Sequence, residues 1–109
     1  MLFPFFTIFA AYHALQFGLF ALPIRRISEL HTPALSAAAI ASWWVVLEWC
    51  FPRVAPWYLG DTLAASPILR QAADLSGPHG LSFLLVLTNA SIALALRRDP
   101  VPYRRFSIA

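Results

Sequence analysis

Residues 34–51 read ALSAAAIASWWVVLEWCF, and this stretch decides the fold class. Its only formal charge is Glu48, which lies near its end. An α-helix rises about 1.5 Å per residue, so about 20 apolar residues cross the hydrocarbon core of a bilayer, which is about 30 Å thick. The run approaches that length, and we therefore predict a transmembrane helix over 34–51.

Two further apolar runs flank this stretch. Residues 1–24 contain no formal charge, and no basic segment precedes the apolar run, which argues against a signal peptide. Residues 81–96 form a third, slightly shorter run, whose length alone would also suit a buried helix of a soluble protein. We predict an all-α membrane protein with transmembrane helices at 3–24, 34–51 and 81–96.

The composition favours a membrane protein over a soluble or nucleic-acid-binding one. Charged residues make up 12% of the chain, about half the share in a typical soluble domain. All eight basic residues are arginines, and they lie in short clusters between apolar runs instead of along one polar face. We therefore expect no nucleic-acid partner. The single cysteine, Cys50, permits no internal disulfide, and no cluster of metal ligands is apparent, so we expect no metal site.

The arginines also predict the orientation in the membrane. Two of them follow the first apolar run, and four more follow the third, whereas the segment 52–80 has only two, countered by two aspartates. With three crossings, the connection 25–33 and the tail 97–109 share one side. The positive-inside rule places that side in the cytoplasm and places 52–80 on the opposite side.

The segment 52–80 reads as an interfacial cap between two membrane helices. It begins with large rings around two prolines, which suits the membrane–water interface. Within it, Ser66 is a suitable N-cap, Pro67 suits the first helical position, and Gly77 suits the end of a helix. Apolar and polar residues occupy opposite faces between them, which predicts a short amphipathic helix lying in the interface plane. His79, in GPHG, is expected in a loop.

Several short motifs follow one another over about residues 10–98. After an aromatic helix that ends in two arginines come W-x-x-x-E-W, a Pro-Trp turn with a nearby glycine, Gln-Ala-Asp, a glycine pair, Ser-Phe and Asn-Ala. They are carried by Trp44, Glu48, Trp49, Pro56, Trp57, Gly60, Gln71, Ala72, Asp74, Gly77, Gly80, Ser82, Phe83, Asn89 and Ala90. Together, their order and spacing resemble the membrane domain of apolipoprotein N-acyltransferases. Phe51 departs from the pattern, since many members have an arginine there.

This resemblance implies a bacterial inner-membrane enzyme whose 52–80 segment is periplasmic. The family moves an acyl chain from a phospholipid donor to a diacylated lipoprotein acceptor, using a Glu–Lys–Cys triad in a periplasmic nitrilase-like domain. It needs no cofactor. The present sequence contains no lysine, and Cys50 does not match the nucleophile motif. We therefore expect the catalytic domain to lie outside this sequence and expect this chain alone to have no acyltransferase activity.

The resemblance and the residue types suggest a set of lipid-contacting side chains. Glu48 is either a functional carboxylate within a membrane helix or a carboxylate near the helix end that reaches toward water, where it can pair with Arg53. Trp57 either borders an acyl chain or belongs to an interfacial aromatic belt. Arg53 either binds a phosphate or pairs locally, and the same holds for Arg70 beside Asp74. The candidates for contact with substrate lipid are Glu48, Arg53, Trp57, Gln71 and Asp74; no catalytic residue is assigned.

Two other functions remain open at the level of sequence. The chain could be a small non-enzymatic membrane scaffold or subunit with three helices. It could also be a piece of a transporter, which would require helices broken near the membrane midplane. Pro4 and Pro23 lie too near the ends of the first apolar run to indicate such a break.

Overall fold

The computed structural model describes residues 2–30, 32–53 and 57–97. Within these ranges it contains three long helices, α1 (Leu2–Ile27), α2 (Pro33–Cys50) and α3 (Pro67–Ala95), the short 3-10 helix η1 (Leu59–Leu63), and no strand. Each long helix is long and apolar enough to cross a membrane. The predicted all-α membrane fold class is therefore confirmed, while the exact membrane boundaries stay a prediction. The predicted tail beyond Arg97 and the proline of the Pro-Trp turn lie outside the described residues.

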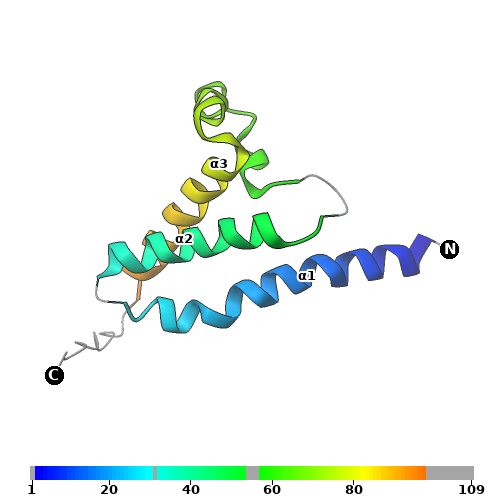
Figure 1. Cartoon of the computed structure of the whole chain (residues 1–109), viewed down its shortest axis with the longest axis horizontal. Helices are drawn as coiled ribbons and strands as arrows, with labels where there is room; N and C mark the ends of the chain where they lie inside the picture. Colours follow the sequence, from blue (N-terminus) through cyan, green and yellow to red (C-terminus); the bar gives the residue numbers. More distant parts are fainter. Residues whose placement is uncertain (1, 31, 54–56, 98–109) are drawn as a thin grey trace.

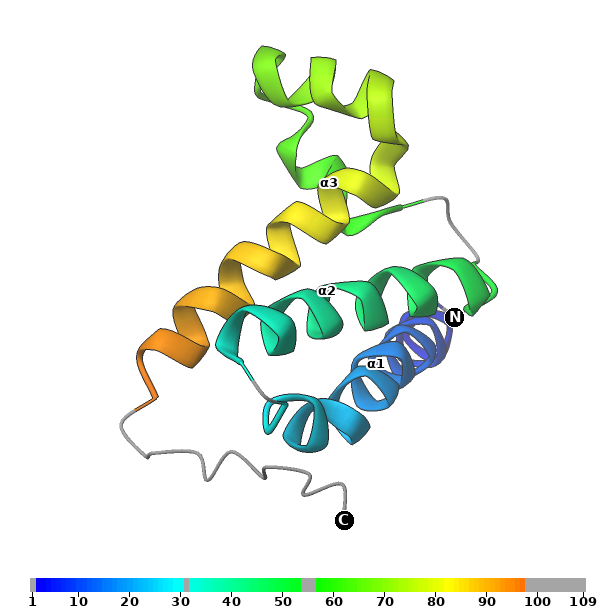
Figure 2. The same cartoon turned by 60° about the vertical axis from the view of Figure 1, so that its left-hand side comes forward.

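Helix α2 is the central helix of the fold. It packs against α1 on one side and against α3 on the other. Helices α1 and α2 run in opposite directions, joined by a short connection, and α3 lies along the far side of α2 (Figure 1, Figure 2). The ends of α1 and α3 meet where Arg97 Nη1 donates to Ser28 Oγ at 3.0 Å. The C-terminal ends of α1 and α3 therefore lie at the same end of the structure.

Local sequence signals define both ends of α2. The Thr32 hydroxyl accepts a hydrogen bond from the Leu35 N–H at 3.2 Å, and Pro33 occupies the first turn, where its missing N–H costs nothing. At the other end the Phe51 N–H still donates to the Leu47 carbonyl at 2.9 Å. Pro52 follows and has no N–H with which to continue the helix.

Small residues let α2 and α3 approach each other closely. Ala37 and Ala41 of α2 are almost completely buried and pack against Val86 and Ala90 of α3. Trp44 fills the neighbouring space, where its ring meets the Phe20 ring of α1 edge-on. Helices in a bilayer associate chiefly through such close packing, because lipid chains are as apolar as the side chains.

Much of α1 remains exposed within this chain. Only 6% of its most apolar 18-residue stretch is buried. Its first turns carry large exposed side chains, namely Phe3, Phe5, Phe6 and Ile8. In water such a surface would be a severe aggregation hazard. The surface suits contact with lipid or with further membrane helices.

The predicted short helix and third apolar run are the two arms of α3. They join at Gly77, whose backbone has φ +68° and ψ −177°, a conformation that is essentially restricted to glycine. Pro67 opens the first arm and Pro78 the second, as positions near a helix start allow. Figure 2 shows the first arm turned away from the second. His79 lies in the first turn of the second arm, so its predicted place in a loop was wrong.

Candidate functional site

The most unusual feature of the described structure is a buried carboxylate at the end of α2. Glu48 is only 4% exposed. Its Oε1 accepts hydrogen bonds from the Leu59 N–H at 2.9 Å and from the Ser82 hydroxyl at 3.1 Å. Its Oε2 lies 3.3 Å from His79 Nδ1, within hydrogen-bond distance. Glu48 thus joins α2 to η1 and to the second arm of α3.

Arg53 closes the same site from the chain that follows α2. Its Nη2 donates to the Glu48 backbone carbonyl at 3.0 Å and lies 3.9 Å from the carboxylate. Its Nη1 donates to the Trp57 carbonyl at 2.7 Å. The guanidinium also lies over the Tyr58 ring, 4.2 Å from the ring centre, which is favourable for a cation above an aromatic face. Both terminal nitrogens of its guanidinium therefore donate to backbone carbonyls of this chain.

Gly60 allows η1 to touch α3 directly. Its N–H donates to Ser82 Oγ at 2.8 Å, while the same hydroxyl donates onward to Glu48. A Cβ at position 60 would come within 2.7 Å of Leu81 Cβ and 2.9 Å of Ser82 N. Only glycine fits so close to the backbone of another helix.

His79 completes the cluster from α3. Its ring packs edge-on against Tyr58, with 4.7 Å between ring centres, and lies 5.7 Å from the Trp49 ring. Tyr58 is thereby held between an imidazole and a guanidinium. We call the full set the Glu48 network: Glu48, Arg53, Tyr58, Leu59, Gly60, His79 and Ser82.

The Glu48 network is suited to holding the chain in place, not to catalysis. The Leu59 N–H and the Ser82 hydroxyl donate to Oε1 of Glu48, and His79 Nδ1 and the Arg53 guanidinium lie beside the same carboxyl group. A hydrolytic triad places the histidine between serine and acid, whereas here the acid lies between Ser82 and His79. Ser82 is also completely buried. The network therefore fixes residues 57–63 against the end of α2 and the second arm of α3.

The predicted lipid-contacting residues occupy two different regions. Glu48 and Arg53 lie inside the Glu48 network, and Trp57 lies at its edge, with its carbonyl held by Arg53 and its side chain 79% exposed. Gln71 and Asp74 lie exposed on the first arm of α3. No hydrogen bond or ion pair between described residues joins these two to the network. Contact of all five with lipid stays a prediction.

The local pairings of the two arginines differ. Arg53 does pair with Glu48, as one of the alternatives anticipated. Arg70 instead donates twice to the Ala64 carbonyl, at 2.8 and 3.2 Å, which ties the start of α3 to the end of η1.

Sequence reasoning missed the roles of Tyr58, His79 and Ser82. His79 and Ser82 are three residues apart and so share one face of a helix, which was an available signal. The partner that they share, Glu48, is more than 30 positions away, and only folding reveals that contact.

Comparison with known proteins gives one family. Residues 1–91 match the family described as the apolipoprotein N-acyltransferase N-terminal domain. The chain is also 39% identical over 70 residues to an apolipoprotein N-acyltransferase of Rhodopirellula baltica, a match that covers 61% of this chain and 12% of that protein. No solved structure matches the chain. These matches favour the resemblance over the alternatives of a scaffold or a transporter piece.

Proposed function

This chain belongs to the apolipoprotein N-acyltransferase family, and from that premise we propose that it forms part of the membrane domain that holds lipid substrates below the catalytic domain of such an enzyme. The reaction would move an acyl chain from a phospholipid to the amino-terminal diacylglyceryl-cysteine of a lipoprotein. It would occur at the periplasmic face of a bacterial inner membrane and would need no cofactor. The match covers only 12% of the length of its relative. The acyl transfer is therefore proposed for the whole protein that contains this chain.

The observation that carries this proposal is the Glu48 network. Burying a carboxylate in a membrane helix is costly, and such groups tend to be retained where they serve a function. Here the carboxylate accepts hydrogen bonds from the segment after α2 and from Ser82 of α3, and thereby fixes that segment between the end of α2 and the second arm of α3. A fixed surface at the membrane boundary can position a lipid for reaction, because holding reactants in place lowers the entropic cost of reaction.

Trp57 is the side chain best placed to use this fixed surface. Arg53 binds its backbone carbonyl, so the position of the residue is determined, while its indole remains largely exposed. Trp49, the last large ring of α2, is similarly exposed at 75%. An exposed indole at a membrane boundary offers an apolar wall to an acyl chain and an N–H to a polar group.

The orientation supports the same proposal. Arg25, Arg26 and Arg97 lie at the end of the structure remote from the Glu48 network, since the ends of α1 and α3 meet there. The positive-inside rule would place that end in the cytoplasm. The Glu48 network would then face the periplasm, where the resemblance places the acyl transfer.

The test compares two tryptophans in the full-length enzyme that contains this chain. We expect Trp57→Ala to lower the rate of transfer of a labelled acyl chain from phospholipid to a diacylated lipopeptide by about tenfold, the equivalent of about 1.4 kcal/mol. Trp49→Ala is the comparison variant, because it removes a similarly exposed indole from a residue whose carbonyl Arg53 does not bind. Expression and membrane insertion are measured for both.

The outcomes separate the two interpretations of Trp57. A loss confined to Trp57→Ala, at normal protein level, supports the substrate role. Equal, small effects of both changes would identify an interfacial belt and would overturn the lipid-holding role of the fixed segment. Full specific activity in a Glu48→Gln, Trp57→Ala double variant would do the same.

A further inference from the structure

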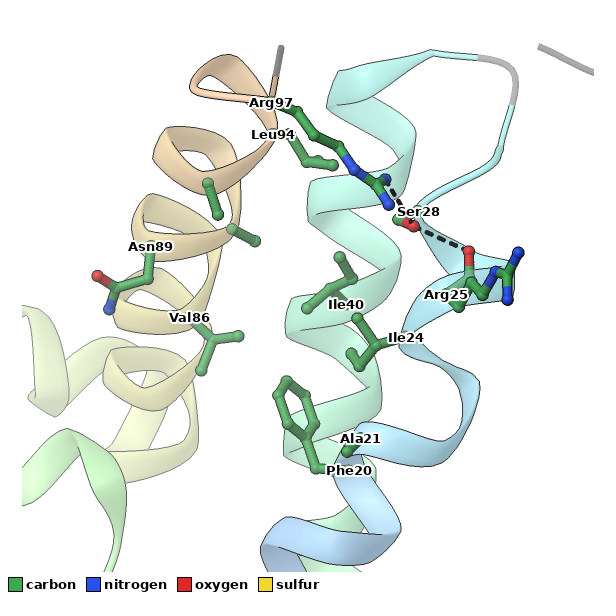
Figure 3. A pocket seen from close by; sticks show the side chains of 12 residues that line it. Phe20, Ala21, Ile24, Arg25, Ser28, Ile40, Val86, Asn89, Leu94 and Arg97 are labelled. Carbon is green, nitrogen blue, oxygen red and sulfur yellow. Dashed lines mark hydrogen bonds between the residues drawn. The ribbon is translucent and has the colours of Figure 1, made fainter. Parts of the chain in front are cut away.

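A groove runs between α1 and α3 at the end of the structure remote from the Glu48 network. Helix α2 lies between the two outer helices and forms the floor of this groove (Figure 3). The volume of the groove is about 740 Å³. The volume lies within the range of small-molecule sites, about 300–1,000 Å³. Its walls are mostly apolar and come from all three helices: Phe20, Ala21, Ile24, Ile40, Val86, Ala90, Ala93 and Leu94.

One end of the groove is polar and positively charged. Arg97 extends from the end of α3 toward α1, where its Nη1 donates to Ser28 Oγ at 3.0 Å (Figure 3). Ser28 is only 7% exposed, and its hydroxyl donates in turn to the Arg25 carbonyl at 2.8 Å. A buried, oriented hydroxyl therefore holds the guanidinium at the mouth of the groove.

The charge at this mouth is not balanced within the groove. The described lining includes Arg25 and Arg97 and no acidic residue. Glu29 pairs with Arg25 at 3.8 Å, but the Arg25 side chain there is 89% exposed, so that pair lies in the solvent-facing layer. Among the residues that the structure describes, the Arg97 guanidinium has a single partner, Ser28, and it carries five N–H donors.

We propose that this groove binds a phospholipid with an anionic head group, with an acyl chain along the apolar walls and the phosphate on Arg97. The occupant must be elongated and apolar along the groove and negatively charged at its mouth, and a phospholipid combines both properties. Arginine binds phosphate through a planar fork of donors, and arginines just beyond helix ends attract anionic lipids. A further apolar helix would fill the walls but would leave the positive charge unmatched.

This lipid is distinct from the substrates of the proposed reaction. Ser82 of the Glu48 network and Arg97 are 15 positions apart along α3, which corresponds to about 22 Å of helix rise. The groove mouth therefore lies toward the opposite face of the membrane. The lipid would be a resident one that fills the space between α1 and α3, and its presence does not depend on the proposed acyl transfer.

The test measures retained lipid by native mass spectrometry of the whole chain purified in detergent and mixed with phosphatidylglycerol. We expect a one-to-one complex that Arg97→Gln weakens about fivefold, as the loss of one arginine near a lipid phosphate implies. Arg26→Gln is the matched control, because Arg26 lies at the same end but does not line this groove. Equal losses for both variants would overturn a site at Arg97 in favour of general charge attraction.

A second pair of variants blocks the apolar part of the groove. Ala93 lines the groove and is exposed, so Ala93→Trp should prevent binding of the acyl chain, whereas Ala95→Trp, an exposed position outside the lining, should not. Circular dichroism shows whether each variant still folds. Binding that survives Ala93→Trp, or that glycerol phosphate displaces as well as phosphatidylglycerol does, would reduce the site to a phosphate site and refute a lipid.

A cysteine at position 93 can also show whether a second copy of the chain occupies the groove. In a Cys50→Ser background, Ala93→Cys should stay monomeric under oxidation and gain protection from maleimide when phosphatidylglycerol is added. A disulfide-linked dimer that excludes lipid would show that a second copy fills the groove, and the proposal would then be wrong.

Discussion

Gly60→Ala tests how closely η1 packs on α3, because position 60 leaves no room for a side chain. The added Cβ would meet Leu81 Cβ at 2.7 Å and Ser82 N at 2.9 Å, and would come closer still to the Pro78 carbonyl oxygen. Two of these three neighbours are backbone atoms, which have no rotamer into which to move. The short helix must therefore move away from α3.

The cost of that movement follows from two effects. Overpacking a closely packed contact costs about 1–3 kcal/mol. Moving η1 also breaks the 2.8 Å bond from the Gly60 N–H to Ser82 Oγ, and a buried donor left without a partner costs about 1–3 kcal/mol. We take about 2–4 kcal/mol in total, since the movement relieves part of the overlap. Each factor of ten in an equilibrium constant corresponds to about 1.4 kcal/mol. The fraction of molecules in which residues 57–63 have detached from α3 should therefore rise about thirtyfold or more.

Hydrogen exchange of the purified chain in detergent measures this opening. We expect amides of the peptide covering residues 57–63 to exchange at least about thirtyfold faster in Gly60→Ala, with little change in the middle of α2. Gly18→Ala is the matched control, because the position is inside a helix and a Cβ there would meet nothing within 4 Å apart from the adjoining backbone and chain neighbours. That change should stabilise α1 by about 0.5–1 kcal/mol.

An unchanged exchange rate over 57–63 in Gly60→Ala would refute the packing of η1 on α3. If Gly18→Ala destabilised the chain as much as Gly60→Ala, the effect would be a general response to alanine. In either case the claim that the Glu48 network holds residues 57–63 against α3 would be wrong.

Three further predictions follow from the same geometry. Glu48→Ala should lower the free energy of unfolding in sodium dodecyl sulfate by about 3–5 kcal/mol, because it leaves buried donors without an acceptor. Glu48→Gln keeps one oxygen and should cost less, and equal costs for the two variants would contradict the predicted role of the carboxylate. Gly77→Ala should cost about 1–3 kcal/mol in the same assay, because its φ of +68° with ψ −177° strains any residue with a Cβ, and a neutral result would argue against the kink. In a Cys50→Ser background, membrane-impermeant maleimide added outside spheroplasts should label Ala64→Cys and not Glu29→Cys; the reverse pattern would invert the predicted orientation.

The amino-acid sequence determined the fold class and its main divisions. Long uncharged runs require a bilayer wherever they are not buried in protein, so composition and length were enough to predict three membrane-length helices. Local chemistry also located the breaks. Pro33 and Pro52 lack an N–H, and Gly77 alone tolerates its backbone angles, so these residues act through their own geometry without help from distant contacts.

The tertiary structure decided the meaning of Glu48. In sequence it was equally compatible with a solvent-reaching residue at a helix end and with a functional carboxylate. Its burial depends on polar partners from positions 59, 79 and 82, which only the folded chain brings to the end of α2. Such contacts depend on how α2 and α3 cross, and sequence periodicity along a single helix contains no information about that crossing.

The groove at Arg97 was equally hidden from the sequence. The arginine itself was visible as part of a basic cluster, and that pattern predicted which side of the membrane it occupies. Its contact with Ser28, 69 positions away, arises because α2 holds α1 and α3 apart while their ends converge. The physical reason is the distance along the chain over which each property acts. The charge, the length and the backbone preferences of a helix are set within its own segment. The burial of a side chain and the identity of its hydrogen-bond partners depend instead on how separate segments pack together.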